Sequence, residues 1–156
     1  MTLLVRDEQD IIRANIEYHL GQGVDFIIAT DNRSVDATAE ILKEFEAAGL
    51  LRYLFEESDD YSQHAWVTRM ARLAHTEHGA DWVINNDADE FWWPLEGNLK
   101  ETFQRVPSSA SIVQADRTST NDSPSRLRMP VASTRRISHK CIAAARSPMT
   151  AADART

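Results

Sequence analysis

Two aspartates one residue apart, Asp87 and Asp89, follow the apolar run Trp82-Val83-Ile84. That run has the length and composition of a buried strand. Carboxylates at the end of such a strand place oxygen donors where an open α/β sheet binds its ligand. Hard cations such as Mg²⁺ and Mn²⁺ prefer these oxygens and complete their coordination with phosphates. The spacing therefore predicts a divalent metal site at Asp87 and Asp89, although aspartate after a strand is also an ordinary turn former.

Further acidic side chains follow two earlier apolar runs. Asp7 and Glu8 come after the first run of the chain, and Asp31 and Asp36 come after the second. Because the carboxyl ends of parallel strands lie at one edge of a sheet, we expect these side chains to gather beside the Asp-x-Asp pair. Their convergence predicts a binding site at that edge.

The elements that would position these residues alternate between strand and helix. Apolar runs predict strands at residues 3–5, 26–29, 51–55 and 82–84. Capping residues and apolar spacing predict helices at residues 12–20, 34–49 and 62–79, with Arg69 beside the apolar stripe of the third. This alternation indicates βαβ units with right-handed crossovers. The predicted fold class is α/β, with a mainly parallel sheet and flanking helices.

The composition is that of an ordinary globular protein, with 42% hydrophobic and 26% charged residues among 156. No apolar run approaches the roughly 18 residues of a membrane-spanning helix. The first residues lack the basic region of a signal peptide, so a cytoplasmic location is expected. The single cysteine, Cys141, rules out an internal disulfide and a cysteine-based zinc cage.

Charge is distributed unevenly along the chain. Residues 1–100 carry 20 acidic and 8 basic side chains, whereas residues 101–156 carry 4 acidic and 9 basic ones. The change predicts one domain over residues 1–115, ending in a short helix at 99–105 and a strand at 110–115, and an irregular basic tail over residues 116–156. The tail has few aromatic residues and no ordered basic stripe, so nucleic-acid binding is not expected.

Three motifs, in this order along the chain, resemble those of a known enzyme family. They are Val5-Arg-Asp-Glu8, Asp31-Asn-Arg-Ser-Val-Asp-Ala-Thr38 and Asn86-Asp-Ala-Asp-Glu-Phe91. Together they look like a family 2 glycosyltransferase with a GT-A fold, and the segment Glu17–Leu20 resembles a bacterial family 2-like subgroup. The resemblance covers roughly residues 3–115 and implies a Rossmann-like domain that binds a nucleotide sugar.

This resemblance implies transfer of a sugar from a nucleotide-diphosphate donor to a hydroxyl acceptor. Carried over by position, Asp87 and Asp89 would hold Mn²⁺ or Mg²⁺ between the two phosphates of the donor. The donor nucleotide would contact Asp7, Glu8, Asp31, Asp36 and Arg69, the last of them at the phosphates. Inverting transfer needs a carboxylate base to deprotonate the acceptor hydroxyl, and we assign that role to no residue.

Two other interpretations stay open. Members of the resembled family continue well beyond the Asp-x-Asp motif, so the short tail predicts a truncated or frame-shifted acceptor-side segment. The chain would then be an inactive fragment that binds nucleotide or serves as an assembly partner. Phosphatases of the haloacid dehalogenase type also carry Asp-x-Asp after a parallel strand, but they need Thr or Val where this chain has Phe91.

The neighbouring residues Trp92 and Trp93 also allow two interpretations. Their rings could form a platform on which a sugar stacks. They could equally be packing residues, because aromatic side chains bury a large apolar area wherever they lie.

Overall fold

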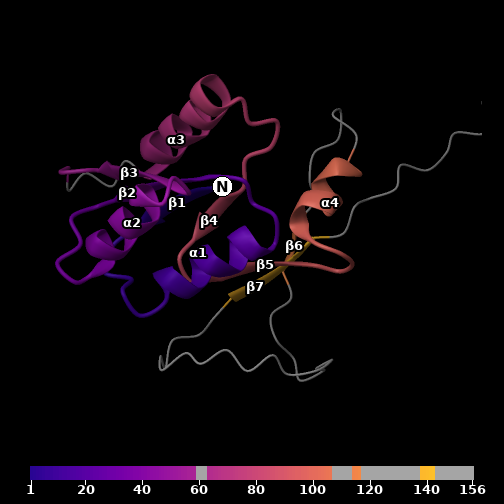
Figure 1. Ribbon diagram of the computed structural model, residues 1–156, viewed down its shortest axis with the longest axis horizontal. Helices are drawn as coiled ribbons and strands as arrows, with labels where there is room; N and C mark the ends of the chain where they lie inside the picture. The colour runs from indigo at the N-terminus through magenta and orange to yellow at the C-terminus, as the bar shows by residue number, and fades with distance from the viewer. Residues whose placement is uncertain (59–62, 107–113, 117–137, 143–156) are drawn as a thin grey trace, which may run out of the picture.

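The computed structural model describes residues 1–58, 63–106, 114–116 and 138–142. Its first part alternates strand and helix as the sequence predicts (Figure 1). The elements are β1 (Thr2–Val5), α1 (Ile12–Gly21), β2 (Ile27–Asp31), α2 (Thr38–Ala47), β3 (Leu51–Phe55), α3 (Gln63–His78) and β4 (Asn85–Asp87). The four strands form one parallel sheet in the order β3-β2-β1-β4. The predicted α/β class is therefore confirmed.

Helices cover both faces of this sheet. Alternate strand residues such as Leu3 and Ala29 pack in one core cluster with Ile16 of α1 and Leu42 of α2. Ile28, whose side chain leaves β2 on the opposite face, packs with α3. The alternation follows from the two-residue period of a strand. Figure 1 shows the resulting layers, with α3 on one side of the sheet and α1 and α2 on the other.

The last strand of the sheet lies later in the chain than predicted. The prediction placed it at residues 82–84, whereas β4 begins at Asn85 and pairs with β1 in the register Thr2↔Asn85 to Leu4↔Asp87. Its central residue, Asn86, is buried with 1% of its surface exposed. A buried amide is tolerated inside a strand only when its polar atoms are hydrogen-bonded, and the partners of Asn86 come from α1 and from the strand that follows.

The second helix also begins later than predicted. It was expected from residue 34, but α2 starts at Thr38. Arg33 has a positive φ of 60°, and the residues after it make hydrogen bonds to the loop that follows β1. The backbone between β2 and α2 is therefore engaged in loop contacts before the helix starts.

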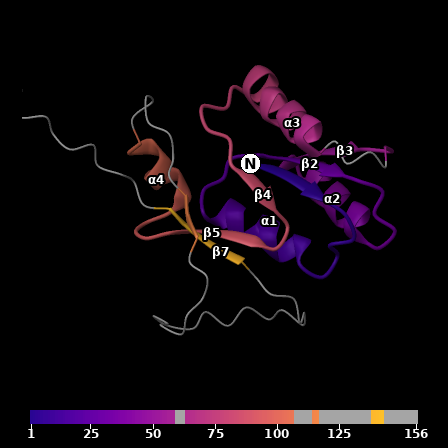
Figure 2. The same cartoon turned by 180° about the vertical axis from the view of Figure 1, so that it is seen from behind.

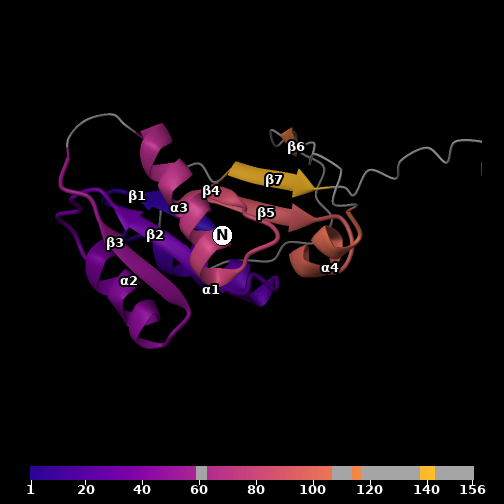
Figure 3. The same cartoon turned by 90° about the horizontal axis from the view of Figure 1, so that it is seen from above.

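A second, smaller sheet follows the first. Its strands are β5 (Glu90–Pro94), β6 (Gln114–Asp116) and β7 (Ser138–Ile142), in the order β5-β7-β6, with α4 (Leu99–Gln104) between β5 and β6. The pairing of β5 with β7 is parallel, and Figures 2 and 3 show the two strands side by side. The short helix predicted at 99–105 is confirmed, with Asn98 capping it by accepting a hydrogen bond from the Glu101 N–H at 2.9 Å.

The structure reaches only part of the segment predicted to be an irregular tail. Within it, β7 is a regular strand, and β6 overlaps the end of the strand predicted at 110–115. The rest of the predicted tail and the start of that strand lie outside the described residues. The domain boundary at residue 115 therefore stays a prediction. Among the helices in the described part of the chain, none combines the length and the apolar composition that a membrane span requires.

Candidate functional site

A cavity of about 410 Å³ opens at the carboxyl edge of the parallel sheet. It is bounded by the ends of β1 and β4, by the residue after β2 and by the start of α3. Its polar lining residues are Arg6, Glu8, Asn32, Gln63, Asp87 and Asp89. Three carboxylates face one guanidinium, so the charge of the lining favours a cation. The topology thus brings Glu8, Asp87 and Asp89 to one cavity, as expected from the strand ends.

The two aspartates stand on either side of a tight turn. Asp87 is the last residue of β4, and Asp89 lies in the turn that leads to Glu90, the first residue of β5. Among the residues that the structure describes, neither carboxylate is engaged by a hydrogen bond or an ion pair. Both residues line the cavity.

The carboxylates of Asp7 and Asp31 have a different setting. The Val35 N–H donates to Asp7 Oδ1 at 2.7 Å, and the Asp7 N–H donates to Ser34 Oγ at 2.9 Å. Asp31 is 1% exposed and accepts hydrogen bonds from the Ser34 N–H at 2.9 Å and from the Tyr53 hydroxyl at 3.0 Å. Neither residue lines the cavity. The hydrogen bonds of Asp7 hold the β1–α1 and β2–α2 loops together, whereas those of Asp31 join the end of β2 to its own loop and to Tyr53 of β3.

Asp36 strengthens the same junction between loops. Its two oxygens accept from the Gln9 N–H at 3.1 Å and from the Thr38 N–H at 2.9 Å. Burial alone would raise the pKa of Asp36, but the hydrogen bonds from Thr38 and Gln9 outweigh it and lower that pKa. The Glu8 N–H donates to Thr38 Oγ1 at 2.8 Å, and Glu8 also lines the cavity.

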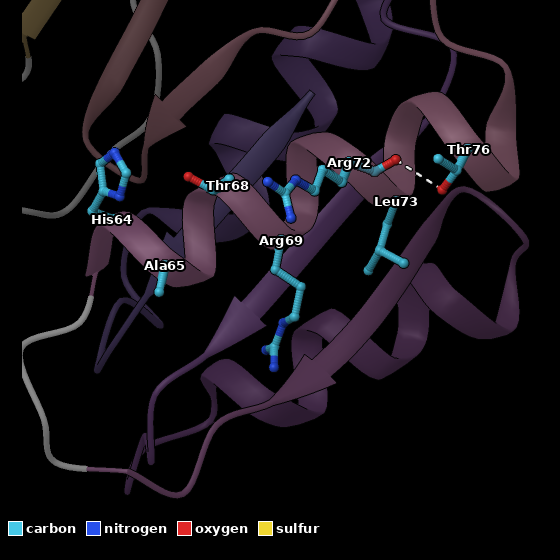
Figure 4. Close-up of a pocket in the computed structure, with 7 residues that line it drawn as sticks. All are labelled: His64, Ala65, Thr68, Arg69, Arg72, Leu73 and Thr76. Atoms are coloured by element: carbon cyan, nitrogen blue, oxygen red, sulfur yellow. Dashed lines mark hydrogen bonds between the residues drawn. The ribbon is translucent and has the colours of Figure 1, made fainter.

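Arg69 lies at a second hollow, on the outer side of α3. This hollow measures about 380 Å³, and Figure 4 shows the Arg69 and Leu73 side chains projecting from one side of the helix that lines it. Arg69 pairs with Glu56, with 3.2 Å between Nη2 and Oε2. The structure therefore does not bring Arg69 to the cavity that Asp87 and Asp89 share, and its contact with donor phosphates stays a prediction.

The turn between β4 and β5 is held by a residue that lies outside the three sequence motifs. Asn15 of α1 has no exposed surface, and its Nδ2 donates to the carbonyls of Ala88 at 2.8 Å and Glu90 at 2.7 Å. Its Oδ1 accepts from Asn86 Nδ2 at 3.2 Å. A polar residue beside the apolar stripe of a predicted helix was the only sequence signal for this contact.

Trp92 and Trp93 differ in the structure. Trp92 is 7% exposed, and its indole N–H donates to Asn86 Oδ1 at 2.7 Å. It is a packing residue, so a sugar-stacking role for its ring is wrong. Trp93 is 44% exposed and stacks on Tyr18 with ring centroids 6.1 Å apart. A role for Trp93 in sugar binding stays a prediction.

His19, one turn after Asn15 on α1, links the helix to β5. The Trp92 N–H donates to His19 Nε2 at 3.3 Å, which requires the tautomer with its proton on Nδ1. Nδ1 then donates to the Asn15 carbonyl oxygen, which lies 2.8 Å from it. Burial lowers the pKa of His19 to about 4, and the hydrogen bond to Asn15 opposes this only in part. His19 is therefore neutral at pH 7.

This burial predicts a loss of stability at mildly acidic pH. The unfolded chain binds a proton at His19 below its ordinary pKa near 6.5, whereas the folded protein resists protonation until about 4. The contribution of neutral His19 to the free energy of unfolding is thus complete above pH 6.5 and is lost as the pH falls towards 4. Between pH 7 and pH 5 the free energy of unfolding falls by about 2 kcal/mol from this cause. Urea denaturation of the wild type and of His19→Gln at both pH values measures it. Equal pH dependence of the two proteins would contradict the prediction.

Comparison with known families identifies one family for this chain. The family model described as glycosyltransferase family 92 matches residues 2–145 of the chain. The match covers the parallel sheet, the cavity and both strands that flank the Asp-x-Asp turn, and it continues past residue 115. No curated protein and no solved structure gives a significant match.

Proposed function

Because this chain belongs to glycosyltransferase family 92, we propose that it binds a nucleotide-diphosphate sugar through a divalent cation at Asp87 and Asp89. The sugar is then transferred to a hydroxyl acceptor. The observation that supports this proposal most strongly is the pair of unengaged carboxylates on a cavity at the carboxyl edge of a parallel sheet.

The family match refines the resemblance seen in the sequence. The motifs of this chain resemble family 2, whereas the family model that matches is that of family 92. Both families transfer sugars, so glycosyl transfer is what the resemblance and the match support together. We retain the donor-site arrangement of the GT-A type as part of the proposal, since it is supported by the order of strands, cavity and Asp-x-Asp turn. A nucleotide-sugar donor and an acceptor follow from the glycosyltransferase class.

The residues present fit a Mg²⁺ or Mn²⁺ ion that arrives with its substrate. Across the described part of the chain, no three His, Cys, Asp or Glu side chains are grouped so that they could hold a metal by themselves. Magnesium sites in phosphate-transferring enzymes are typically built from one or two carboxylates, water and substrate phosphates. Asp87 and Asp89 supply such a partial set.

The cation would stabilise the charge that develops on the departing diphosphate. The acceptor oxygen forms a bond to the anomeric carbon of the sugar as the bond to the diphosphate breaks, and the hydroxyl proton passes to a base that we leave unassigned. Asp87 and Asp89 orient the diphosphate, while Glu8 and Asn32 lie in the same cavity where the nucleoside would contact the protein. We propose that Asp7, Asp31 and Asp36 support nucleotide binding by holding the two loops around it.

Calorimetric titration of UDP and GDP into the protein, each with and without Mn²⁺, tests this function. We expect one nucleotide to bind with an affinity that rises at least about tenfold when Mn²⁺ is present, since the cation bridges carboxylates and phosphates. Absence of binding by the folded protein, with or without the ion, would contradict the proposal. Nucleotide binding in this titration, together with no release of sugar from the corresponding nucleotide sugar in a separate transfer assay, would favour the inactive-fragment interpretation.

A further inference from the structure

We propose that Asn15 is a positioning residue for the cation site, because its carboxamide fixes the β4–β5 turn (residues 87–90) and so directs the carboxylates of Asp87 and Asp89. This inference rests on the proposed function, since it concerns the same site. Asn15 itself does not line the cavity and would touch neither the donor nor the ion.

The carboxamide of Asn15 contacts the turn from its inner side. Its Nδ2 lies 2.8 Å from the Ala88 oxygen, 2.7 Å from the Glu90 oxygen and 3.4 Å from the Asp87 oxygen. The two amide hydrogens serve the two shorter contacts. Because these carbonyls face α1, the turn presents the side chains of Asp87 and Asp89 to the cavity on its other side.

Water cannot replace this contact in the folded protein. Asn15 has no exposed surface, Asn86 is 1% exposed and Ala88 is 4% exposed. Backbone carbonyls buried at such a place need a donor, and no other side chain among the described residues donates to the Ala88 oxygen. Removal of the Asn15 donors therefore leaves the buried Ala88 oxygen without a donor, while the Glu90 oxygen keeps only Asn86 Nδ2 at 3.2 Å. We expect the turn to move until the Ala88 oxygen reaches solvent or another partner.

Asn15 is also held in place on its other side. Its Oδ1 accepts from Asn86 Nδ2 at 3.2 Å and faces His19 Nδ1 at 3.1 Å. Its backbone lies on α1, whose residues Ile12 and Ile16 have no exposed surface. The turn is thus attached to a packed helix through a carboxamide with one available orientation. Hydrogen-bonded outer partners of this kind orient metal ligands and tune metal affinity.

The variant Asn15→Leu tests the role, because leucine has nearly the same shape and no donor or charge. We expect the affinity for Mn²⁺ together with the nucleoside diphosphate that binds, UDP or GDP, to fall roughly 10- to 100-fold, the range observed when outer partners of metal ligands are removed. The affinity for the same nucleotide without metal should change less. Hydrogen exchange should accelerate at residues 86–92 and stay unchanged in β2.

The control variant Leu42→Ala removes a fully buried side chain from α2, whose main contacts are with α1, β2 and β3. Measured at a temperature where all proteins are folded, it should keep the metal-dependent affinity despite its lower stability. Equal losses of metal-dependent affinity in Leu42→Ala and Asn15→Leu would overturn the positioning role. An unchanged metal-dependent affinity in Asn15→Leu would overturn it as well. Wild-type protein that shows no Mn²⁺-dependent binding would instead overturn the proposed function, while the exchange data would still report whether Asn15 holds the turn.

Discussion

Replacement of Asp89 by asparagine is expected to lower the affinity for Mn²⁺ with a nucleoside diphosphate by more than about 100-fold, since removal of an outer partner alone costs 10- to 100-fold. Asp89 supplies one of two carboxylates on the cavity, and an amide oxygen carries no net charge to offset the cation. The fold should be unaffected, because no hydrogen bond or ion pair among the described residues involves the Asp89 carboxylate. Calorimetric titration together with thermal unfolding measures both quantities.

The matched control is Glu96→Gln, which removes one negative charge from an exposed side chain outside the cavity. It changes the net charge of the protein by the same amount as Asp89→Asn. If both variants lost affinity equally, the effect would be a general electrostatic one. Unchanged binding in Asp89→Asn would remove this residue from the cation site.

Replacement of Trp92 by alanine is expected to lower the free energy of unfolding by about 3–5 kcal/mol, the usual cost of truncating a large buried aromatic side chain. The Trp92 ring is 7% exposed and its indole N–H donates to Asn86 Oδ1 at 2.7 Å. Its loss leaves a cavity beside α1 and an unpaired oxygen on β4. Urea denaturation followed by circular dichroism measures the change.

Two companion variants separate packing from hydrogen bonding. Trp92→Phe keeps most of the buried ring but leaves Asn86 Oδ1 without its donor, so a loss of about 1–3 kcal/mol is expected. Trp93→Ala truncates the adjacent residue, which is 44% exposed. It should lower the free energy of unfolding clearly less than Trp92→Ala does. The assignment of Trp92 to the core fails if Trp92→Ala and Trp93→Ala prove equally stable.

The alternation of strand and helix could be predicted because it rests on local patterns. The strand at residues 51–55 was predicted with the bounds that the structure has, and α1 and α3 begin and end within two residues of their predicted ends. Parallel topology then places the carboxyl ends of β1 and β4 together, which is how Glu8, Asp87 and Asp89 come to share a cavity. This part of the site follows from strand ends alone.

The parts that could not be predicted depend on contacts between distant residues. Asn15 and the carbonyl of Ala88 are separated by 73 positions, and nothing local in the sequence indicates that one donates to the other. Asn86 suits a strand interior only where its amide has partners, and because those partners are distant in the sequence, the apolar pattern predicts a strand that ends before it. The amide of Asn15 and the indole of Trp92 satisfy it, and β4 can therefore include it.

The side chains of Asp7, Asp31 and Asp36 illustrate a second limit of predicting site residues from the sequence. An acidic residue after a strand can bind a ligand or accept hydrogen bonds from nearby backbone, and its sequence position is the same in both cases. In the structure, the three carboxylates accept from N–H groups of the two loops. Only the geometry of the loops distinguishes these residues from Asp87 and Asp89.

The cation site at Asp87 and Asp89 is tested most directly by locating the metal itself. Crystals grown with Mn²⁺ and the nucleoside diphosphate that binds would be measured at a wavelength where manganese scatters anomalously. We predict one anomalous peak between the carboxylates of Asp87 and Asp89, with the diphosphate completing the coordination. A bound nucleotide with the manganese peak elsewhere, or with no peak, would contradict the account.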